Sequence, residues 1–370
     1  MTMIAESMFV RIPALAVQHN AINLAQGVFD HGPPAELLRA LVAAGENEAV
    51  HQYMPSAGLP ALRKAVAAST GSDPDTEVTI TAGATEALHC TMSALLGVGD
   101  EAIIVEPAYE QYAPAIAAAG ATAVPLRLTD LRASFADMLQ AARTARTRVV
   151  VVNSPWNPLG RSLTAEEWAA LADLAHRHGI VVVSDETYEY LLPAGARHYG
   201  VLDAVADPEK RVKLSSVSKS LAATGWRVGW AVAGPDLTRR IRAVHQYVTF
   251  CPSVPLQHAV AETMASPRFA DIVAGVAAGL HERASWFASE LVELGLPATV
   301  QENPFYLLAD VGEPAEAWCD RMVRDGGVAT LPLSVFYSAP VSSVDTIVRF
   351  AVCKRRETLE IAAQRLGSRR

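Results

Sequence analysis

Short runs of β-branched and aliphatic residues recur between residues 78 and 232, separated by longer segments rich in Ala and Leu. This alternation is typical of an α/β fold with a mainly parallel sheet and helices on both faces. The run 149–152 consists of four valines, which indicates a strand covered on both sides, in the centre of the sheet. The predicted strands are 78–81, 102–105, 148–153, 180–184, 212–216 and 228–232.

Local signals predict one helix between two of these strands. Thr164 is followed three residues later by Glu167, the pattern of a capping box. Gly179 supplies a stop signal. Together they predict a helix over residues 165–178.

The pattern changes after Pro267. A long helical stretch is followed by an apolar run at 305–309, a second helical stretch and a strand-like run at 347–352. The chain of 370 residues is long enough for two domains. We expect a large domain over 41–265 and a smaller α+β domain over 266–370. Residues 1–40 are expected to contribute to the small domain and to a dimer interface.

Charge, hydropathy and cysteine spacing indicate which kinds of partner and compartment to expect. The formal net charge is -8 and the Lys and Arg residues are scattered, which disfavours nucleic acid. The chain has no run of about 18 apolar residues that could span a bilayer. Its four cysteines are far apart without a C-x-x-C pair, and the amino terminus lacks a basic segment leading into an apolar core. We expect a cytoplasmic protein with reduced, mostly buried thiols, small-molecule partners, no membrane contact and no metal site.

A lysine follows the predicted strand 212–216. Lys219 can project into a cleft, where desolvation and nearby cations favour the neutral amine that forms imines. Ser216, Ser218 and Arg227 could hold a phosphate beside it. A surface lysine and a salt-bridged arginine are the alternative.

A glycine turn follows the strand 78–81. Gly83, Ala84 and Thr85 lead into a helical run, and the unpaired N–H groups of a helix amino terminus bind anions. The segment lacks the G-x-G-x-x-G pattern of dinucleotide-binding folds, and it lacks the G-x-x-x-x-G-K-[ST] pattern of the P-loop. Both kinds of nucleotide site are therefore disfavoured. An ordinary strand-turn-helix junction without a ligand explains the same residues.

Two more strand ends carry polar side chains. Asn157 lies between two prolines after the strand 148–153, at the sheet edge where α/β proteins bind ligands. Asp185 could keep a pyridine nitrogen protonated, and Tyr188 could hydrogen-bond the phenolic oxygen of the same ring. A plain turn and a helix cap are the structural alternatives.

One arginine lies among apolar residues near the carboxyl terminus. Arg349 interrupts the run 347–352, and a buried guanidinium is costly unless it is paired. A substrate carboxylate is a good bidentate partner. An internal salt bridge to an Asp or Glu is the alternative.

In this order and at these separations, the five segments resemble the fold-type I aminotransferases of class I, which use pyridoxal 5′-phosphate (PLP). The resemblance extends over nearly the whole chain. Within the class, the chain is most similar to the kynurenine aminotransferase and cysteine-conjugate β-lyase group, which also contains methionine aminotransferases. The resemblance implies a large α/β domain on a mainly parallel seven-stranded sheet, with a smaller α+β domain. Further matching segments are 22–27, Tyr53, 58–63, 106–109 and 332–337.

The resemblance also implies roles for individual residues. Lys219 would hold PLP as a Schiff base and move the substrate proton. Asp185 would pair with the pyridine nitrogen, and Asn157 and Tyr188 with the ring oxygen. The remaining implied roles are Tyr109 for stacking on the ring, Gly83, Ala84, Thr85, Ser216 and Arg227 for the phosphate, Tyr53 for the phosphate of the other subunit of a homodimer, and Arg349, Asn157 and Gly27 for the substrate carboxylate. Trp156 is a candidate wall of the substrate pocket, and packing beside the cofactor is the alternative.

The implied activity is ping-pong transfer of an amino group from a neutral or aromatic L-amino acid to a 2-oxo acid such as 2-oxoglutarate. Several positions near the expected pocket depart from the family pattern: Trp156, Val28 with Phe29, and Asn303 with Pro304. The motifs leave open a PLP-dependent carbon–sulfur β-lyase or cyclase, because its first steps are the same. A non-catalytic regulator domain would carry a DNA-binding domain ahead of this fold, whereas the family motifs here begin near Ile22.

Overall fold

The computed structural model describes residues 8–127 and 134–368. These residues form two compact units. Unit 1 comprises residues 8–31, 156–161 and 277–368, and unit 2 comprises residues 32–127, 134–155 and 162–276. The chain therefore passes from one unit to the other several times, including once inside the long helix α12 (Phe269–Glu293). No helix in the described part of the chain combines the length and apolar character needed to cross a bilayer.

A seven-stranded sheet forms the centre of unit 2, in the order β2-β8-β7-β6-β5-β3-β4. Only β8 runs antiparallel to its neighbours, so the predicted α/β class with a mainly parallel sheet is confirmed. The strands are β2 (Val78–Thr81), β3 (Glu101–Glu106), β4 (Thr122–Arg127), β5 (Thr147–Asn153), β6 (Val181–Asp185), β7 (Arg211–Ser216) and β8 (Gly229–Ala233).

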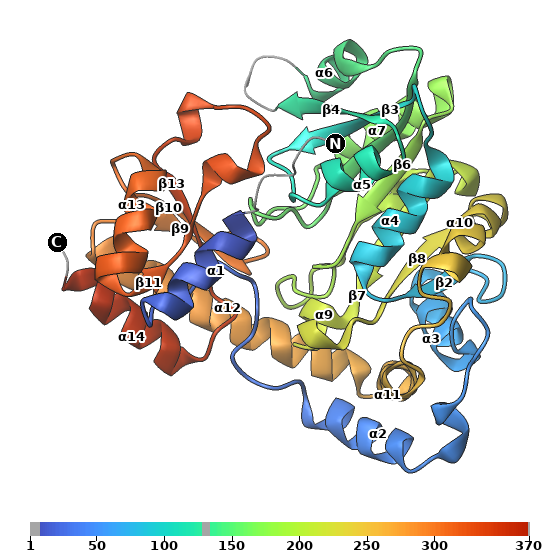
Figure 1. Ribbon diagram of the computed structural model, residues 1–370, viewed down its shortest axis with the longest axis horizontal. Helices are drawn as coiled ribbons and strands as arrows, with labels where there is room; N and C mark the ends of the chain where they lie inside the picture. Colours follow the sequence, from blue (N-terminus) through green and yellow to red (C-terminus); the bar gives the residue numbers. More distant parts are fainter. Residues whose placement is uncertain (1–7, 128–133, 369–370) are drawn as a thin grey trace. The chain divides into compact units, whose positions relative to one another are not determined.

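Helices cover both faces of this sheet (Figure 1). In β8, Ala231 and Ala233 point to a core shared with α4, α5 and α10, whereas Trp230 and Val232 point to a core shared with α2, α3 and α11. The helices of unit 2 are α2 (Ala35–Gly45), α3 (Pro60–Thr70), α4 (Ala84–Leu95), α5 (Tyr112–Ala118), α6 (Phe135–Ala142), α7 (Ala165–His178), α8 (Val201–Ala204), α9 (Val217–Ser220), α10 (Pro235–Val248) and α11 (Val254–Ala265).

The helix predicted over 165–178 is α7, with both ends as expected. The Thr164 hydroxyl accepts from the backbone of Glu167 at 3.2 Å, and the Glu167 carboxylate accepts from the backbone of Thr164 at 2.8 Å. Gly179 ends the helix with φ of 66°, a left-handed conformation that glycine adopts without strain.

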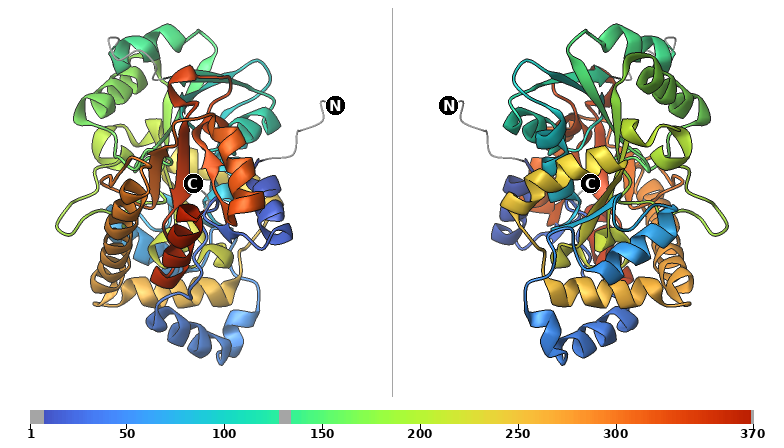
Figure 2. Two further views of the ribbon diagram at one scale, coloured as in Figure 1. Left: turned by 90° about the vertical axis from the view of Figure 1, so that its left-hand side faces the viewer. Right: turned by 90° about the vertical axis from the view of Figure 1, so that its right-hand side faces the viewer.

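Unit 1 is built on a four-stranded antiparallel sheet in the order β12-β13-β10-β9. The amino-terminal helix α1 packs with β11, and Ile12 and Ala16 share a core with Val323 and Leu331. The elements are α1 (Met8–Gln18), β1 (Ile22–Asn23), β9 (Ala298–Thr299), β10 (Tyr306–Asp310), α13 (Ala315–Arg321), β11 (Val328–Ala329), β12 (Leu331–Pro332), β13 (Ile347–Ala351) and α14 (Arg356–Gly367), with α13 in orange and α14 in dark red in Figure 2.

None of the four cysteines forms a disulfide. Cys90, Cys319 and Cys353 are buried, and Cys251 is half-buried. Burial raises the pKa of both Cys90 and Cys319 to about 12, so these thiols stay protonated. The burial of three of the four side chains agrees with the expectation of mostly buried thiols.

Candidate active site

The carboxyl ends of β6 and β7 bring three predicted site residues to one edge of the sheet of unit 2. Asp185 is the last residue of β6 and Ser216 the last of β7, and Asp185 pairs with Leu214 in the register of the two strands. Lys219 lies in the short helix α9, immediately after β7, and is half-buried. In open α/β sheets, this edge is where ligands bind.

The Asp185 carboxylate is held at both oxygens. Its Oδ1 accepts from the backbone N–H and the hydroxyl of Thr187 at 3.2 and 2.7 Å. Its Oδ2 accepts from the hydroxyl of Tyr112 at 2.9 Å. Burial raises the pKa of Asp185, although these hydrogen bonds oppose the shift. A carboxyl group in this state can share a proton with a basic ring nitrogen.

The predicted phosphate turn is the amino terminus of α4. Gly83 precedes the helix with φ of 81°, and a β-carbon there would lie 2.5 Å from the guanidinium of Arg227. Arg227 Nη2 donates to the Thr85 hydroxyl at 3.3 Å. The backbone of β8 also approaches closely, since a β-carbon at Gly229 would lie 2.6 Å from the Ala84 nitrogen. Small residues thus bring a helix amino terminus and an arginine together.

The charge of Arg227 has no acidic partner among the described residues. Its hydrogen bonds go to the Thr85 hydroxyl and the Thr224 carbonyl, at 3.3 and 3.2 Å, and the side chain is exposed. The Ser216 hydroxyl lies nearby in sequence and caps α9 by accepting from the Ser218 backbone at 3.3 Å. An arginine, a helix amino terminus and hydroxyls together suit a phosphate monoester.

Two buried residues that the sequence analysis did not identify hold the phosphate turn. Glu86 Oε2 accepts from the Ala82 backbone at 2.5 Å, and its Oε1 lies 2.9 Å from His245 Nδ1. His245 Nε2 lies 2.8 Å from the Ser56 carbonyl oxygen. No sequence signal links these residues, since 159 positions separate Glu86 from His245.

Three tyrosines complete the predicted set in unit 2. Tyr188 is buried, in the segment that follows Asp185. Tyr109 is half-buried and meets Tyr112 edge-on, with ring centroids 5.9 Å apart. Tyr53 is 88% exposed and rests on Phe250 at 5.7 Å. A large aromatic side chain this exposed is available to a partner.

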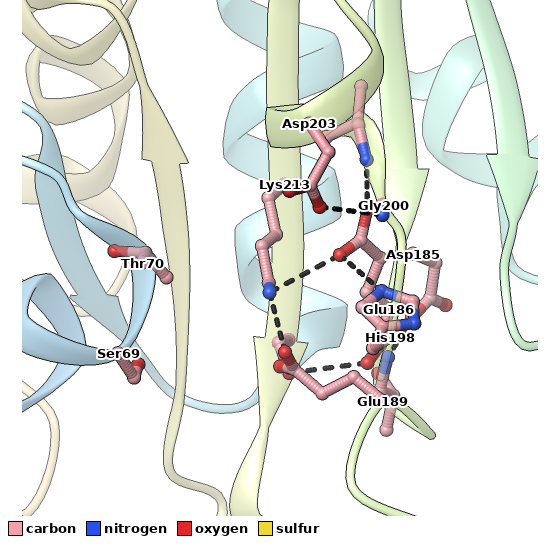
Figure 3. Close-up of polar contacts among 12 residues, drawn as sticks. Ser69, Thr70, Asp185, Glu186, Glu189, His198, Gly200, Asp203 and Lys213 are labelled. Atoms are coloured by element: carbon pink, nitrogen blue, oxygen red, sulfur yellow. Dashed lines mark hydrogen bonds and ion pairs between the residues drawn. The ribbon is translucent and has the colours of Figure 1, made fainter. Parts of the chain in front are cut away.

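A buried charge cluster lies beside Asp185 (Figure 3). Lys213 Nζ lies 2.5 Å from Glu189 and 3.3 Å from Glu186. His198 Nε2 lies 2.9 Å from Glu186, whose other oxygen accepts from the Val201 backbone at 2.8 Å. The cluster therefore contains two carboxylates, one ammonium and one imidazole.

The electrostatics of the cluster follow from its composition. Burial alone would raise the pKa of Glu186, but Lys213 and His198 outweigh it and hold this pKa at about 2. Burial would lower the pKa of Lys213, yet Glu189 and Glu186 keep it above its ordinary range. Glu186 likewise raises the pKa of His198 against the effect of burial. Only glycine fits at position 200, because a β-carbon there would overlap the Glu186 carboxylate.

Unit 1 holds the predicted carboxylate-binding residues. Arg349 is completely buried in β13, where Nη1 donates to Asn157 Oδ1 at 2.8 Å and Nη2 to the Ala25 carbonyl at 2.6 Å. Its guanidinium carbon lies 3.8 Å from the ring centroid of Tyr306 and 4.8 Å from that of Phe336.

Arg349 has no carboxylate partner in the described part of the chain, and its Nε is buried without a hydrogen-bond partner. The internal salt bridge considered from the sequence is therefore absent among these residues. A buried, uncompensated guanidinium is costly, and an incoming carboxylate would compensate it. Tyr306, which sequence reasoning missed, stacks on this guanidinium and lies so close to Gly27 that a side chain there would overlap its hydroxyl.

Trp156 is 3% exposed and belongs to the same unit. Its backbone N–H donates to the Arg161 carbonyl at 2.7 Å, and the Arg161 guanidinium carbon lies 4.9 Å from the centroid of its ring. The turn 156–161 is held in turn by Asn303, whose N–H donates to the Gly160 carbonyl at 2.7 Å. These contacts give Trp156 a defined position beside Asn157.

Comparison with known proteins identifies the family of this chain. The sequence model of the family "Aminotransferase class I and II" matches residues 19–366. The probable N-succinyldiaminopimelate aminotransferase of Mycobacterium tuberculosis is 35% identical, over 98% of this chain and 96% of that protein. The solved structure of that aminotransferase has a TM-score of 0.92 to this chain and covers 98% of it and 97% of its own chain.

Two other relatives match over almost their whole length. The methionine aminotransferase of Escherichia coli is 35% identical, over 97% of this chain and 95% of that protein. Human kynurenine–oxoglutarate transaminase 1 is 29% identical, over 97% of this chain and 94% of that protein. The chain therefore belongs to the class I and II aminotransferase family, as a fold-type I enzyme of the PLP-dependent class I.

Proposed function

We propose that this aminotransferase moves the amino group of a neutral or aromatic L-amino acid to a 2-oxo acid such as 2-oxoglutarate, in two half-reactions of a ping-pong mechanism. The observation that carries the proposal is the group at one sheet edge of unit 2: the Lys219 amine, the Asp185 carboxylate and the turn of Gly83 and Thr85 with Arg227. They supply an amine, a carboxylate that can share a proton with the pyridine nitrogen, and a binding site for a phosphate. Bound PLP needs all three.

The residues fit PLP, which when bound supplies an electron sink for the substrate α-carbon. The Lys219 amine would hold PLP, and it would move the proton of the substrate α-carbon. Asp185 pairs with the pyridine nitrogen, and Tyr188 with the ring oxygen. Tyr109 stacks on the ring. The phosphate is held by Ala84, Thr85, Ser216 and Arg227.

The substrate carboxylate is taken by Arg349, with Asn157 and the backbone near Gly27. Two observations support this role. Arg349 is completely buried, and a hydrogen bond to Asn157 already orients its guanidinium group. Two aromatic side chains of unit 1 lie beside these residues: Trp156 precedes Asn157 in the chain, and the ring of Tyr306 stacks on Arg349. Apolar aromatic surface favours a neutral or aromatic substrate side chain over an acidic one.

The relatives differ in the substrates that their names give: N-succinyldiaminopimelate, methionine and kynurenine. Methionine is a neutral amino acid and kynurenine an aromatic one, and both support the proposed class. N-succinyldiaminopimelate carries further carboxylates and represents the competing specificity.

A half-reaction measurement tests the proposal. Each amino acid of a broad panel, with N-succinyl-L,L-diaminopimelate included, is added alone to the PLP-loaded enzyme. Conversion of the bound cofactor to its amine form is followed by absorbance. We expect single-turnover conversion by neutral and aromatic amino acids, reversed by 2-oxoglutarate. Release of pyruvate and ammonia without an oxo acid would instead identify a lyase, and no conversion by any member would contradict transamination.

We also propose that the active form is a homodimer and that it works in the cytoplasm. Unit 2 exposes Tyr53, Tyr247, Val248 and Phe250, with Tyr247 86% exposed. A second copy of this chain would cover this aromatic group and bring Tyr53 to the partner's phosphate site. Four cysteines without a disulfide among them are consistent with a reducing compartment.

A further inference from the structure

The carboxylate of Asp185 has two kinds of hydrogen-bond donor among the described residues. Thr187, two positions away in the same segment, supplies both donors to Oδ1. Oδ2 receives one bond, from the Tyr112 hydroxyl at 2.9 Å. A carboxylate oxygen accepts two hydrogen bonds in its plane, so Oδ2 keeps one position for a ring N–H.

Tyr112 is built into the core rather than placed at a surface. It is 2% exposed and is the first residue of α5, 73 positions before Asp185. Burial and the neighbouring Asp185 raise the pKa of Tyr112 well above its ordinary value. The hydroxyl therefore keeps its proton at neutral pH and remains a donor to Oδ2.

The same side chain also touches the ring-stacking residue. The rings of Tyr112 and Tyr109 meet at 81° with centroids 5.9 Å apart. An edge-to-face contact of this kind restrains both rings. Tyr112 thus contacts two groups that the proposed function assigns to PLP, the pyridine-nitrogen carboxylate and the stacking ring, although no family motif singled it out.

The other charges near Asp185 do not replace this donor. Glu186 is the adjacent residue, and its charge raises the pKa of Asp185. That charge is met within the buried cluster by Lys213 at 3.3 Å and His198 at 2.9 Å. Among the described residues, Thr187 and Tyr112 donate hydrogen bonds to the Asp185 carboxylate. Of these two, Tyr112 is the one that comes from a distant part of the sequence.

We propose that Tyr112 is a positioning residue that keeps Asp185 ionised, so that the proton shared with the pyridine nitrogen stays on the nitrogen. The proposal rests on the proposed role of Asp185 toward PLP. Without the hydroxyl, the carboxylate oxygen becomes more basic and the shared proton moves from nitrogen to oxygen. A neutral pyridine withdraws electrons less strongly than a pyridinium, so loss of the substrate α-proton to Lys219 slows.

The test combines kinetics with a spectroscopic signature. Wild type and Tyr112→Phe are loaded with PLP labelled with ¹⁵N in the ring, and the ¹⁵N chemical shift reports whether that nitrogen carries a proton. For the variant we expect a shift toward neutral pyridine, a fall in kcat of about 10- to 100-fold, the range for losing a hydrogen bond to a charged group, and a larger α-deuterium isotope effect.

Tyr190→Phe is the matched control. It removes another tyrosine hydroxyl of unit 2, one that pairs with Ser69, from a ring packed on Phe269. Its ¹⁵N shift and kcat are expected to stay at the wild-type values. If Tyr112→Phe behaves like Tyr190→Phe while wild type binds PLP and transaminates, the role of Tyr112 is wrong. If wild type itself fails to bind PLP, the proposed function fails.

A second substitution covers the case in which Tyr112→Phe does not fold. Site-specific incorporation of 4-aminophenylalanine at position 112 keeps the ring and a weaker N–H donor. Its ¹⁵N shift is expected between those of wild type and neutral pyridine. A shift identical to wild type would overturn the proposal.

Discussion

At the scale of single residues, the site depends on cations that the described residues leave without acidic partners. Arg349 is buried with only Asn157 and a backbone carbonyl on its terminal nitrogens, and Arg227 has only neutral acceptors. A buried cation without an acid is costly in a protein that only needs to be stable. The cost is explained if Arg349 binds a substrate carboxylate, whereas the exposed Arg227 is open to a phosphate.

Arg349→Lys tests the carboxylate role. Lysine keeps the charge but cannot make the two parallel bonds of a guanidinium, so we expect KM for the amino acid to rise about 10- to 100-fold. The affinity for PLP should stay within about twofold of wild type, measured by titration of the cofactor absorbance. An equal loss of PLP affinity would contradict the separation of the two anion sites.

Gly229→Ala tests the phosphate turn. The new β-carbon would lie 2.6 Å from the Ala84 nitrogen and from the Gly83 carbonyl carbon, so the turn must move. We expect at least a tenfold weaker affinity for PLP, with a fall of about 1–3 kcal/mol in the free energy of unfolding. Gly225→Ala is the control, because its β-carbon would meet nothing within 4 Å. Equal behaviour of the two variants would count against a tightly packed phosphate turn.

At the scale of helices and strands, local signals predicted most of the sheet of unit 2. The four valines of 149–152 lie in β5, between β6 and β3 in the interior of the sheet. The capping box predicted the start of α7 and Gly179 its end. The strand β4 was missed because it is an edge strand with mixed burial and contains Pro125, a residue that weakens any strand prediction. The two-residue strands β1, β9, β11 and β12 are too short to show periodicity.

The individual site residues were predictable where they follow a strand or open a helix, as Lys219, Asp185 and Gly83 do. Their supporting contacts were not predictable, because Tyr112 reaches Asp185 over 73 positions and His245 reaches Glu86 over 159. A single sequence contains no signal for such pairs. Only the folded sheet, with α5 and α10 packed on it, brings them together.

Lys213→Met tests the buried cluster that joins β7 to the segment after β6. Removing the ammonium leaves Glu186 and Glu189 buried without it, and we expect about 3–5 kcal/mol less free energy of unfolding, measured by urea titration. Asp185 and Tyr188 lie in the same segment, so PLP affinity should fall as well. A variant as stable as wild type would show that the cluster contributes little.

The cluster also predicts a pH dependence of stability. Glu186 raises the pKa of His198 above its ordinary value of 6.5. A raised folded-state pKa contributes stability that is complete below the unfolded value and is lost as the pH rises through the folded value. The difference in free energy of unfolding between wild type and His198→Gln should therefore shrink from about pH 6.5 upward. His176→Gln, at the exposed end of α7, is the control; a constant difference across this range would contradict the prediction.

At the scale of the whole molecule, the proposed homodimer predicts complementation between two damaged chains. Lys219→Ala removes the amine, and Tyr53→Phe removes the hydroxyl that we expect to reach the partner's phosphate. In a mixed dimer, one site receives the intact Lys219 of one chain and the intact Tyr53 of the other. We expect activity and PLP affinity at wild-type values for that site, measured after mixing and purifying differently tagged chains. Mixed dimers no better than the two parents would place Tyr53 outside the partner's site.

The proposed chemistry depends on the amine of Lys219. The most direct measurement is reduction of the PLP-loaded protein with borohydride, followed by digestion and mass spectrometry of the labelled peptide. We predict a single phosphopyridoxyl group on Lys219 and loss of the label in Lys219→Ala. A label on another lysine, or unchanged turnover in Lys219→Ala, would contradict the account.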